Sequence, residues 1–285
     1  MSHDERQSPE RLDAALVEAF AESFLNTRDY YPEQLEDGSY VARKAPISMP
    51  LVEQHLRGYR TIGAYALDSN SLARWLCFDG DDEGSWSELK ALALDLASQG
   101  QPAYLEQSRR GGHLWVFFGE PLPGRLVRQF GRGLLQQTDA QLIKEIYPRQ
   151  DKLQTGPGSL VRLPLGIHRK SMRRYGFVTL EGQPLAASVR EQLAFIAAPD
   201  TVSGDFVRQF VARLPDDPPP YQPTELRTLY TGDGGLLSER IKRAVTVPQF
   251  VAQYVDLDGR GRGLCPFHDD HRESFGVSHE HNFWS

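Results

Sequence analysis

Hydrophobic positions in the first part of the chain repeat with two different periods. Leu12, Leu16, Phe20 and Phe24 recur at helical spacing after Ser8-Pro9-Glu10, where serine and proline suit the N-cap and first turn of a helix. Short apolar runs between turn-forming residues predict strands instead. The predicted strands cover residues 61–67, 72–78, 103–107, 113–118, 159–165 and 174–180, and further helices are predicted over 85–100, 124–138, 188–197 and 203–213.

The regular patterns stop at the segment PDDPPPYQP, which has the composition of a stiff linker. We therefore expect a first domain over residues 1–214, a linker over 215–224 and a C-terminal segment over 225–285. Two short helices are predicted near 235–244 and 248–255 in that segment.

Composition is typical of a globular protein, with 40% hydrophobic residues among 285. Only two cysteines are present, Cys77 and Cys265, so a disulfide framework is excluded and a reducing cytoplasm is the expected location. No run is apolar enough to span a bilayer, and the polar start MSHDERQSPER does not resemble a secretory signal.

The formal net charge is -6, but the charge is unevenly distributed. Between Ser108 and Arg174 there are 13 basic and 4 acidic side chains, so this stretch is basic within an acidic chain. Such an arrangement favours a local site for a polyanion over a generally basic surface.

The segment FDGDDEG places four acidic residues directly after the predicted strand 72–78. Residues two apart on a strand point to the same side, so Asp79 and Asp81 should project together. Their repulsion would be relieved by a divalent cation such as Mg²⁺ or Mn²⁺, which prefers carboxylate oxygens. The alternative is a plain acidic turn, with Asp82 and Glu83 capping the next helix.

A second candidate site is the segment SRRGGH, which joins two predicted strands. Its glycines would let backbone N–H groups approach a phosphate, and Arg109 and Arg110 could bind phosphate through two hydrogen bonds each. His113 begins the second strand, where it could donate to a phosphate oxygen. The competing interpretation is a half-buried strand histidine with one satisfied ring nitrogen.

Further along, the segment YPRQD offers Asp151 as a third carboxylate, although a turn aspartate is an equally ordinary interpretation. The segment IHRKSMRR then supplies His168, Lys170 and several arginines, close in sequence to Arg162.

In their order and spacing, FDGDD, SRRGGH, YPRQD and GSLVRLPLGIHRK together resemble the archaeo-eukaryotic primase superfamily. The resemblance is to the primase-polymerases of mobile elements, conflict systems and CRISPR loci, and it covers roughly residues 28 to 180. It implies an α+β fold, a two-layer core with an RRM-like palm and an N-terminal α/β module. The arginine pair in the hairpin departs from relatives that carry small residues there.

The resemblance also implies the reaction, which is template-directed addition of NTP or dNTP to a 3′-hydroxyl on single-stranded DNA, with two divalent ions. Its motifs assign the catalytic and metal-binding roles to Asp79, Asp81 and Asp151. The implied nucleotide-binding residues are Ser108, Arg109, Arg110, His113, His168 and Lys170. The expected DNA contacts are Arg125, Arg128, Arg132, Arg169, Arg173 and Arg174.

Two other classes of function remain open at this stage. A metal-dependent nuclease or phosphohydrolase could use the same aspartate pair, and it would cleave DNA or a phosphoester without incorporating nucleotides. A non-catalytic single-stranded-DNA-binding module would show salt-dependent binding and no metal-dependent chemistry.

The C-terminal segment contains CPFH, in which Cys265 and His268 have the spacing of zinc ligands. The segment resembles the start of the zinc ribbon of bacterial replicative primases. The second cysteine pair of such a ribbon would lie beyond Ser285, so these two residues form a partial site, and a complete ribbon would bind Zn²⁺.

Overall fold

A computed structural model describes residues 12–154 and 156–215, together with residues 251, 255, 257, 258, 261–263, 275–278 and 283–284. The chain divides into two compact units, residues 1–214 and 215–285. None of the described helices is both long and apolar enough to cross a membrane.

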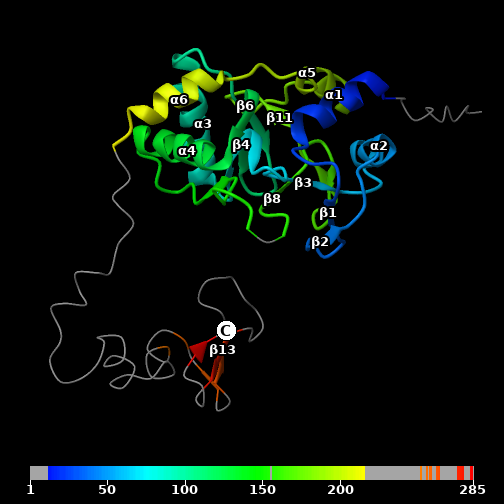
Figure 1. Cartoon of the computed structure of the whole chain (residues 1–285). Coiled ribbons are helices and arrows are strands. Elements are labelled where there is room, and N and C mark those ends of the chain that lie inside the picture. The colour runs from blue at the N-terminus through cyan, green and yellow to red at the C-terminus, as the bar shows by residue number, and fades with distance from the viewer. Residues whose placement is uncertain are drawn as a thin grey trace, which may run out of the picture. The chain divides into compact units, whose positions relative to one another are not determined.

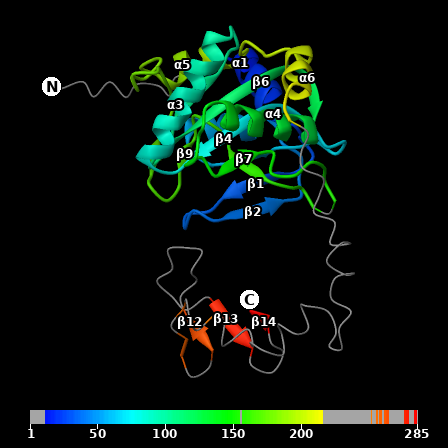
Figure 2. The same ribbon diagram turned by 90° about the vertical axis from the view of Figure 1, so that its left-hand side faces the viewer.

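A five-stranded antiparallel sheet forms the centre of the first unit. Its strands follow the order β11 (Phe177–Val178), β5 (Tyr104–Gln107), β6 (Gly112–Pro123), β4 (Leu72–Gly80) and β7 (Glu145–Tyr147). The long strands β4 and β6 are buried over most of their length, as their apolar sequences predict. Figure 2 shows β7 beside β4, at the edge of the sheet.

Alternate residues of these strands pack into two separate cores. Leu76 and Phe78 face the helices α3 (Glu83–Ser98), α4 (Gly124–Gln137) and α6 (Gly204–Ala212), and these helices lie on one side of the sheet (Figure 1). Trp75 and Cys77 point to the opposite face, which is covered by α1 (Ala14–Phe24) and α5 (Val189–Ile196). The architecture is thus α+β with layers on both faces of the sheet.

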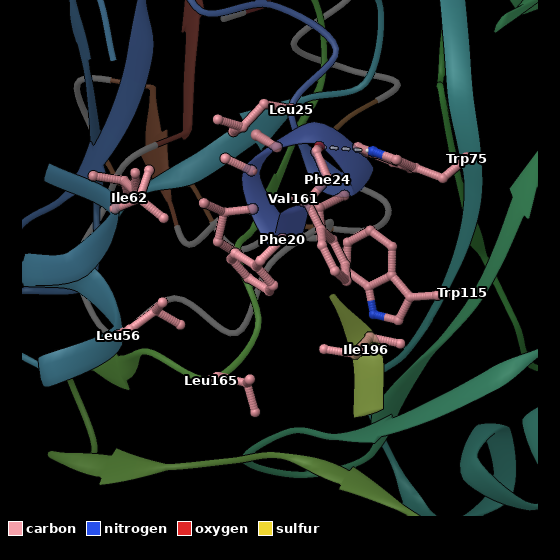
Figure 3. Close-up of a cluster of buried hydrophobic side chains, with 14 of the residues drawn as sticks. Phe20, Phe24, Leu25, Leu56, Ile62, Trp75, Trp115, Val161, Leu165 and Ile196 are labelled. Carbon is pink, nitrogen blue, oxygen red and sulfur yellow. Dashed lines mark hydrogen bonds between the residues drawn. The ribbon is translucent and has the colours of Figure 1, made fainter. Parts of the chain in front are cut away.

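Aromatic side chains fill the core under α1 (Figure 3). The Phe24 ring packs edge-on against Trp115 at 5.2 Å between ring centroids, and Trp75 packs edge-on against Trp115 at 5.0 Å. The Trp75 indole N–H donates to the Phe24 carbonyl oxygen over 2.8 Å, so its buried polar atom is satisfied. These contacts fix α1 against the sheet.

Several shorter elements complete the first unit. They are β1 (Tyr31–Gln34) paired with β2 (Tyr40–Arg43), α2 (Met49–Arg57), β3 (Gly63–Tyr65) paired with β8 (Leu160–Arg162), and β9 (Ile167–His168) paired with β10 (Arg173–Arg174). The sequence pattern does not predict β1, β2, α2 or β7. β1 and β2 lie within residues 28–50, which are rich in turn formers, and β7 is only three residues long. α2 begins at the end of that region and is also missed. The predicted strand over 174–180 is divided between β10 and β11.

The helix predicted over 85–100 is confirmed with a shifted start. α3 begins at Glu83 because Asp82 is its N-cap and forms a reciprocal capping box with Ser85. The predicted N-terminal helix begins at Ala14, with the Asp13 carboxylate accepting from the Ala15 N–H; Ser8 lies outside the described residues.

The described residues of the second unit include a three-stranded antiparallel sheet of β12 (Arg262–Gly263), β13 (Phe275–Ser278) and β14 (Phe283–Trp284). Val251, Val255, Phe275 and Val277 are buried together there. The predicted linker beyond Pro215, the predicted helix at 235–244, and Cys265 and His268 lie outside the described residues.

Candidate active site

The register of the central sheet aligns four ionisable residues in one row across four strands. Glu106 on β5 pairs with His113 on β6, His113 pairs with Asp79 on β4, and Asp79 pairs with Glu145 on β7. Directly paired residues point to the same face of a sheet. The row therefore lies on the face opposite α3 and α4, close to the end of β4.

A pocket of about 560 Å³ opens beside this row. Of the nine predicted catalytic and nucleotide-binding residues, seven line it: Asp79, Asp81, Ser108, Arg109, Arg110, His113 and His168. The pocket also contains residues that the sequence analysis did not assign to the site, notably Tyr40, Tyr147, Arg149, Ser159 and Arg162. Segments far apart in the sequence thus contribute to one cavity.

Asp79 and Asp81 differ in their surroundings. The Asp79 side chain is 22% exposed, whereas the Asp81 side chain is 71% exposed. Burial raises the pKa of Asp79; the nearby His113 opposes this shift, and the negative charges of Asp81 and Glu145 add to it. This pair is the part of the acidic segment that faces the pocket.

The hairpin between β5 and β6 lies against the end of β4 because two glycines leave no side chain in the way. A Cβ atom at Gly111 would lie 2.1 Å from the Gly80 carbonyl oxygen, and one at Gly112 would lie 2.1 Å from the Trp86 ring. The Ser108 N–H donates to the Gly111 carbonyl oxygen over 2.9 Å and closes the turn. Arg110 is brought within 3.4 Å of the Asp81 carboxylate.

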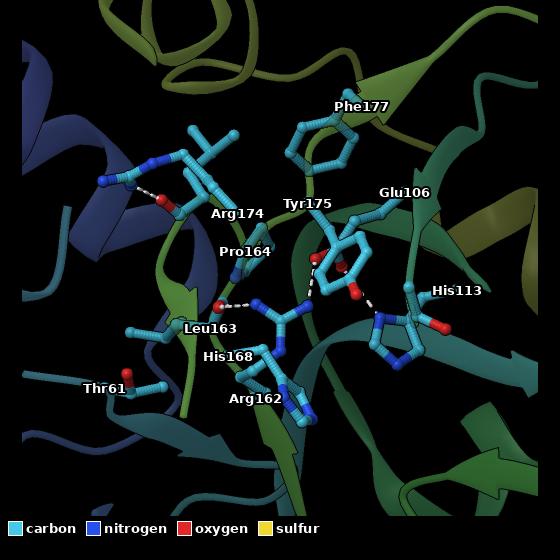
Figure 4. A network of polar contacts seen from close by, with 12 residues as sticks. Thr61, Glu106, His113, Arg162, Leu163, Pro164, His168, Arg174, Tyr175 and Phe177 are labelled. Atoms are coloured by element: carbon cyan, nitrogen blue, oxygen red, sulfur yellow. Dashed lines mark hydrogen bonds and ion pairs between the residues drawn. The ribbon is translucent and has the colours of Figure 1, made fainter. Parts of the chain in front are cut away.

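Behind the hairpin, Glu106 connects three side chains, and Figure 4 shows its contacts with two of them, His113 and Arg162. Its carboxylate accepts hydrogen bonds from His113 Nδ1 at 2.8 Å, Trp115 Nε1 at 2.9 Å and Arg162 Nη2 at 2.8 Å. Burial acts to raise the pKa of Glu106, but Arg162 and His113 outweigh it and lower the pKa. Burial likewise acts to lower the pKa of His113, but Glu106 and Asp79 raise it.

His168 and Lys170, the two predicted phosphate contacts after β8, differ in their position relative to the pocket. His168 lines the pocket, and its Nδ1 atom accepts from the Ser171 N–H at 3.2 Å. Burial and the neighbouring Arg162 lower the pKa of His168. Lys170 is not part of the pocket wall, and its side chain instead packs 3.3 Å from where a Cβ atom of Gly38 would stand.

The structure does not bring Asp151 to the two other aspartates. Asp151 forms an ion pair with Arg128 on α4, and its carbonyl oxygen packs against Gly124. Gly124 donates to the Ser71 carbonyl oxygen, which lies just before the start of β4. Asp79 lies eight positions after Ser71 along the strand, which corresponds to about 26 Å at ~3.3 Å per residue.

Glu145 is the carboxylate that occupies the position next to Asp79. It lies six residues before Asp151, and its two oxygens contact the Tyr147 hydroxyl and the Arg149 guanidinium. The Arg149 guanidinium also stacks 5.1 Å from the Tyr147 ring centroid. An acidic residue within an apolar run, as in KEIYP, is the sequence signal that could have identified it.

The basic residues expected to contact DNA lie away from the pocket wall. Arg125, Arg128 and Arg132 belong to α4, which packs on the other face of the sheet. Arg174 donates to the Leu56 and Leu165 carbonyl oxygens, and Arg169 donates to the Gly58 carbonyl oxygen. Arg169 and Arg174 therefore donate hydrogen bonds to the C-terminal end of α2. Arg173 on β10 is exposed.

The donor chemistry of the pocket suits a hard cation. Asp79 and Asp81 offer carboxylate oxygens, which Mg²⁺ and Mn²⁺ prefer. Within the described part of the chain, no three histidine, cysteine, aspartate or glutamate side chains are grouped to hold a metal ion. The candidate centre is thus an aspartate pair, with Glu145 beside it but engaged by Arg149.

Comparison with known proteins identifies one family. A family model described as the archaeo-eukaryotic primase domain of TOTE conflict systems matches residues 18–209. No curated protein matches the chain.

Two solved structures are similar over most of their own length. One is the catalytic domain of primase RepB′ in complex with initiator DNA, with 14% identity, a TM-score of 0.36, and coverage of 70% of this chain and 99% of that chain. The other is the polymerase domain of Mycobacterium tuberculosis Ligase D in complex with DNA, with 16% identity, a TM-score of 0.40, and coverage of 71% and 90%.

Proposed function

Because this chain belongs to the archaeo-eukaryotic primase domain family of TOTE conflict systems, we propose that it is a template-directed nucleotidyltransferase. It would act as a DNA primase, a DNA polymerase or both, adding NTP or dNTP to a 3′-hydroxyl on a single-stranded DNA template. The observation that carries the proposal is that one pocket combines the Asp79 and Asp81 carboxylates with several basic side chains. This is the combination that a metal-bound triphosphate requires.

Asp79 and Asp81 would hold the divalent ions, Mg²⁺ or Mn²⁺. Burial, with the negative charges of Asp81 and Glu145, raises the pKa of Asp79, and a bound cation would favour its ionised form and offset that repulsion. When bound, such ions lower the pKa of an attacking hydroxyl and stabilise charge on the phosphate as pyrophosphate leaves. We assign the third acidic role to Glu145 in place of Asp151, because Glu145 is the register partner of Asp79.

The basic side chains of the pocket would bind and orient the triphosphate. Arg109 and Arg110 are exposed on the hairpin and offer planar guanidinium groups, which bind phosphate through paired hydrogen bonds. His113 and Arg162 are held from behind by Glu106, so they are ordered before any ligand arrives. A preordered cationic wall stabilises the charge that develops on the phosphates during transfer.

Replacing both pocket aspartates, Asp79→Ala with Asp81→Ala, should abolish nucleotide incorporation. Loss of the metal-binding carboxylates removes several kcal/mol of transition-state stabilisation, so we expect a decrease of more than about 1,000-fold. The measurement is incubation with single-stranded template, Mn²⁺ or Mg²⁺ and labelled NTP or dNTP, with and without primer, followed by gel separation of the products.

Asp82→Ser is the matched control, because it removes a neighbouring carboxylate but retains a side chain that can cap α3. It should extend primers like the unmodified protein. Extension by the double variant at an unchanged rate would refute the proposed site. Template cleavage without incorporation would instead indicate a nuclease, and salt-dependent DNA binding with no metal-dependent product would indicate a binding module.

A further inference from the structure

Glu106 is a charged residue with no exposure to solvent and no place in the pocket wall. It is 0% exposed, and all three of its side-chain partners are themselves buried: His113, Trp115 and Arg162. Two of these partners, His113 and Arg162, line the pocket. Glu106 therefore stands directly behind two groups that face the pocket, on the far side from any ligand.

The hydrogen bonds to Glu106 determine which nitrogen atoms of His113 and Arg162 remain free to contact other groups. His113 uses Nδ1 to reach Glu106, which leaves Nε2 pointing toward Asp79 at 3.6 Å. Arg162 uses Nη2 for Glu106, and its Nη1 donates to the Leu163 carbonyl oxygen at 3.1 Å (Figure 4). Both groups are thus held in one orientation by the same carboxylate.

A purely structural role does not explain a charge at this position. A buried carboxylate loses its hydration, and a buried ion pair is often replaced by apolar residues without loss of stability. The surrounding core is apolar and aromatic, with Trp115 and Phe177 close by in the sheet. An apolar residue on β5 would suit that core, but it would leave His113 and Arg162 free to turn.

We propose that Glu106 is a positioning residue, which holds the His113 imidazole and the Arg162 guanidinium in the orientation that receives the incoming nucleoside triphosphate. The inference rests on the proposed function for the identity of that ligand. Its basis is the geometry of the three hydrogen bonds and the burial of Glu106. Residues that hydrogen-bond metal ligands from behind typically change affinity by about 10- to 100-fold when mutated, and we expect an effect of that order here.

Glu106→Gln tests the inference, because glutamine has nearly the same shape but replaces one acceptor oxygen by a donor. That donor would face either Arg162 or the pair His113 and Trp115, so at least one contact is lost. We expect the dissociation constant of a fluorescent nucleoside triphosphate, measured with Mn²⁺ by anisotropy, to rise about 10-fold or more. The affinity for single-stranded DNA should change less than the affinity for nucleotide.

Glu88→Gln is the matched control, since Glu88 accepts hydrogen bonds from the backbone N–H groups of residues 141–143 and is not part of the pocket. Both variants replace a hydrogen-bonded carboxylate by an amide, but only Glu106→Gln should weaken nucleotide binding. Equal nucleotide affinity in the two variants would overturn the inference.

A measurement on the unmodified protein keeps the inference separable from the proposed function and from any folding defect. In a two-bond nitrogen–proton correlation spectrum of histidine-labelled protein, the His113 signal, identified by its loss in His113→Gln, should show a proton on Nδ1. A bare Nδ1 would overturn the inference. A protonated Nδ1 in a protein that binds no nucleotide would support the geometry while refuting the proposed function.

Discussion

At the scale of single residues, the acidic segment after β4 divides into separate roles. Asp79 and Asp81 face the pocket, while Asp82 accepts from the Ser85 N–H and caps α3. Glu83 lies in the first turn of that helix, where its negative charge meets the positive end of the helix dipole. The helix-cap interpretation is thus confirmed for Asp82, and the metal-site interpretation stays a prediction for Asp79 and Asp81.

His55 is a buried residue whose chemistry makes stability depend on pH. Its Nδ1 atom accepts from the Ile62 N–H at 3.2 Å, so its Nε2 must carry the proton that bonds the Pro164 carbonyl oxygen at 2.9 Å. Burial lowers the pKa of His55 to about 3. The folded state therefore holds His55 neutral, whereas the unfolded chain protonates it near pH 6.5.

Acidification should consequently destabilise the fold through His55. Its contribution is fully present above the unfolded pKa of about 6.5 and is lost progressively as pH falls from there toward 3. Between pH 7 and pH 5 we expect a decrease of about 2 kcal/mol in the free energy of unfolding from this residue. Urea unfolding of His55→Gln should show a pH dependence flatter by that amount; parallel curves for the two proteins would contradict the assignment.

At the scale of elements, pairing register decides which side chains meet. β7 is only three residues long, yet its alignment with β4 places Glu145 directly opposite Asp79. The segment that follows β7 carries Asp151 to the other end of β4, where it binds Arg128. A difference of six positions in the sequence thus separates a residue beside the pocket from one on the opposite side of the sheet.

Glu145→Gln and Asp151→Asn form a matched pair that tests this assignment. Glu145→Gln should reduce nucleotide incorporation by about 100-fold or more, because it removes negative charge beside Asp79, one of the two aspartates proposed to bind metal. Asp151→Asn should leave incorporation within about threefold and cost at most about 1 kcal/mol of stability, as expected of an exposed ion pair. Primer extension measures the effect on activity, and thermal unfolding measures the effect on stability. If Asp151→Asn reduced incorporation more than Glu145→Gln did, the third acidic role would belong to Asp151.

At the scale of the whole molecule, the candidate site lies on the face of the central sheet opposite α3 and α4. Both described cores of the first unit are built from residues between Val17 and Val207, and the pocket is lined by residues between Gln34 and His168. The family match, over 18–209, covers the same region. Fold and candidate site therefore belong to the first unit.

A fragment comprising residues 1–214 should fold by itself and bind nucleotide. Since the described core and pocket residues of this unit all lie before position 214, we expect cooperative unfolding and a nucleotide dissociation constant within about threefold of the full chain, a difference below ~1 kcal/mol. Denaturant unfolding and fluorescent nucleotide titration provide the measurements. Failure to unfold cooperatively would mean that residues 215–285 contribute to the core.

The sequence by itself determined the local features of this protein: the strand that leads into Asp79, the glycine hairpin before His113, and the helix that follows the acidic segment. These follow from the two-residue period of strands, the space that glycines leave and the preference of aspartate for helix caps, all of which act over a few residues. The tertiary structure decided that Glu145 lies beside Asp79, that Glu106 stands behind His113 and Arg162, and that Arg169 and Arg174 bind backbone carbonyls. Those contacts join residues up to 118 positions apart, and strand register and packing, which no local pattern encodes, set which of them meet.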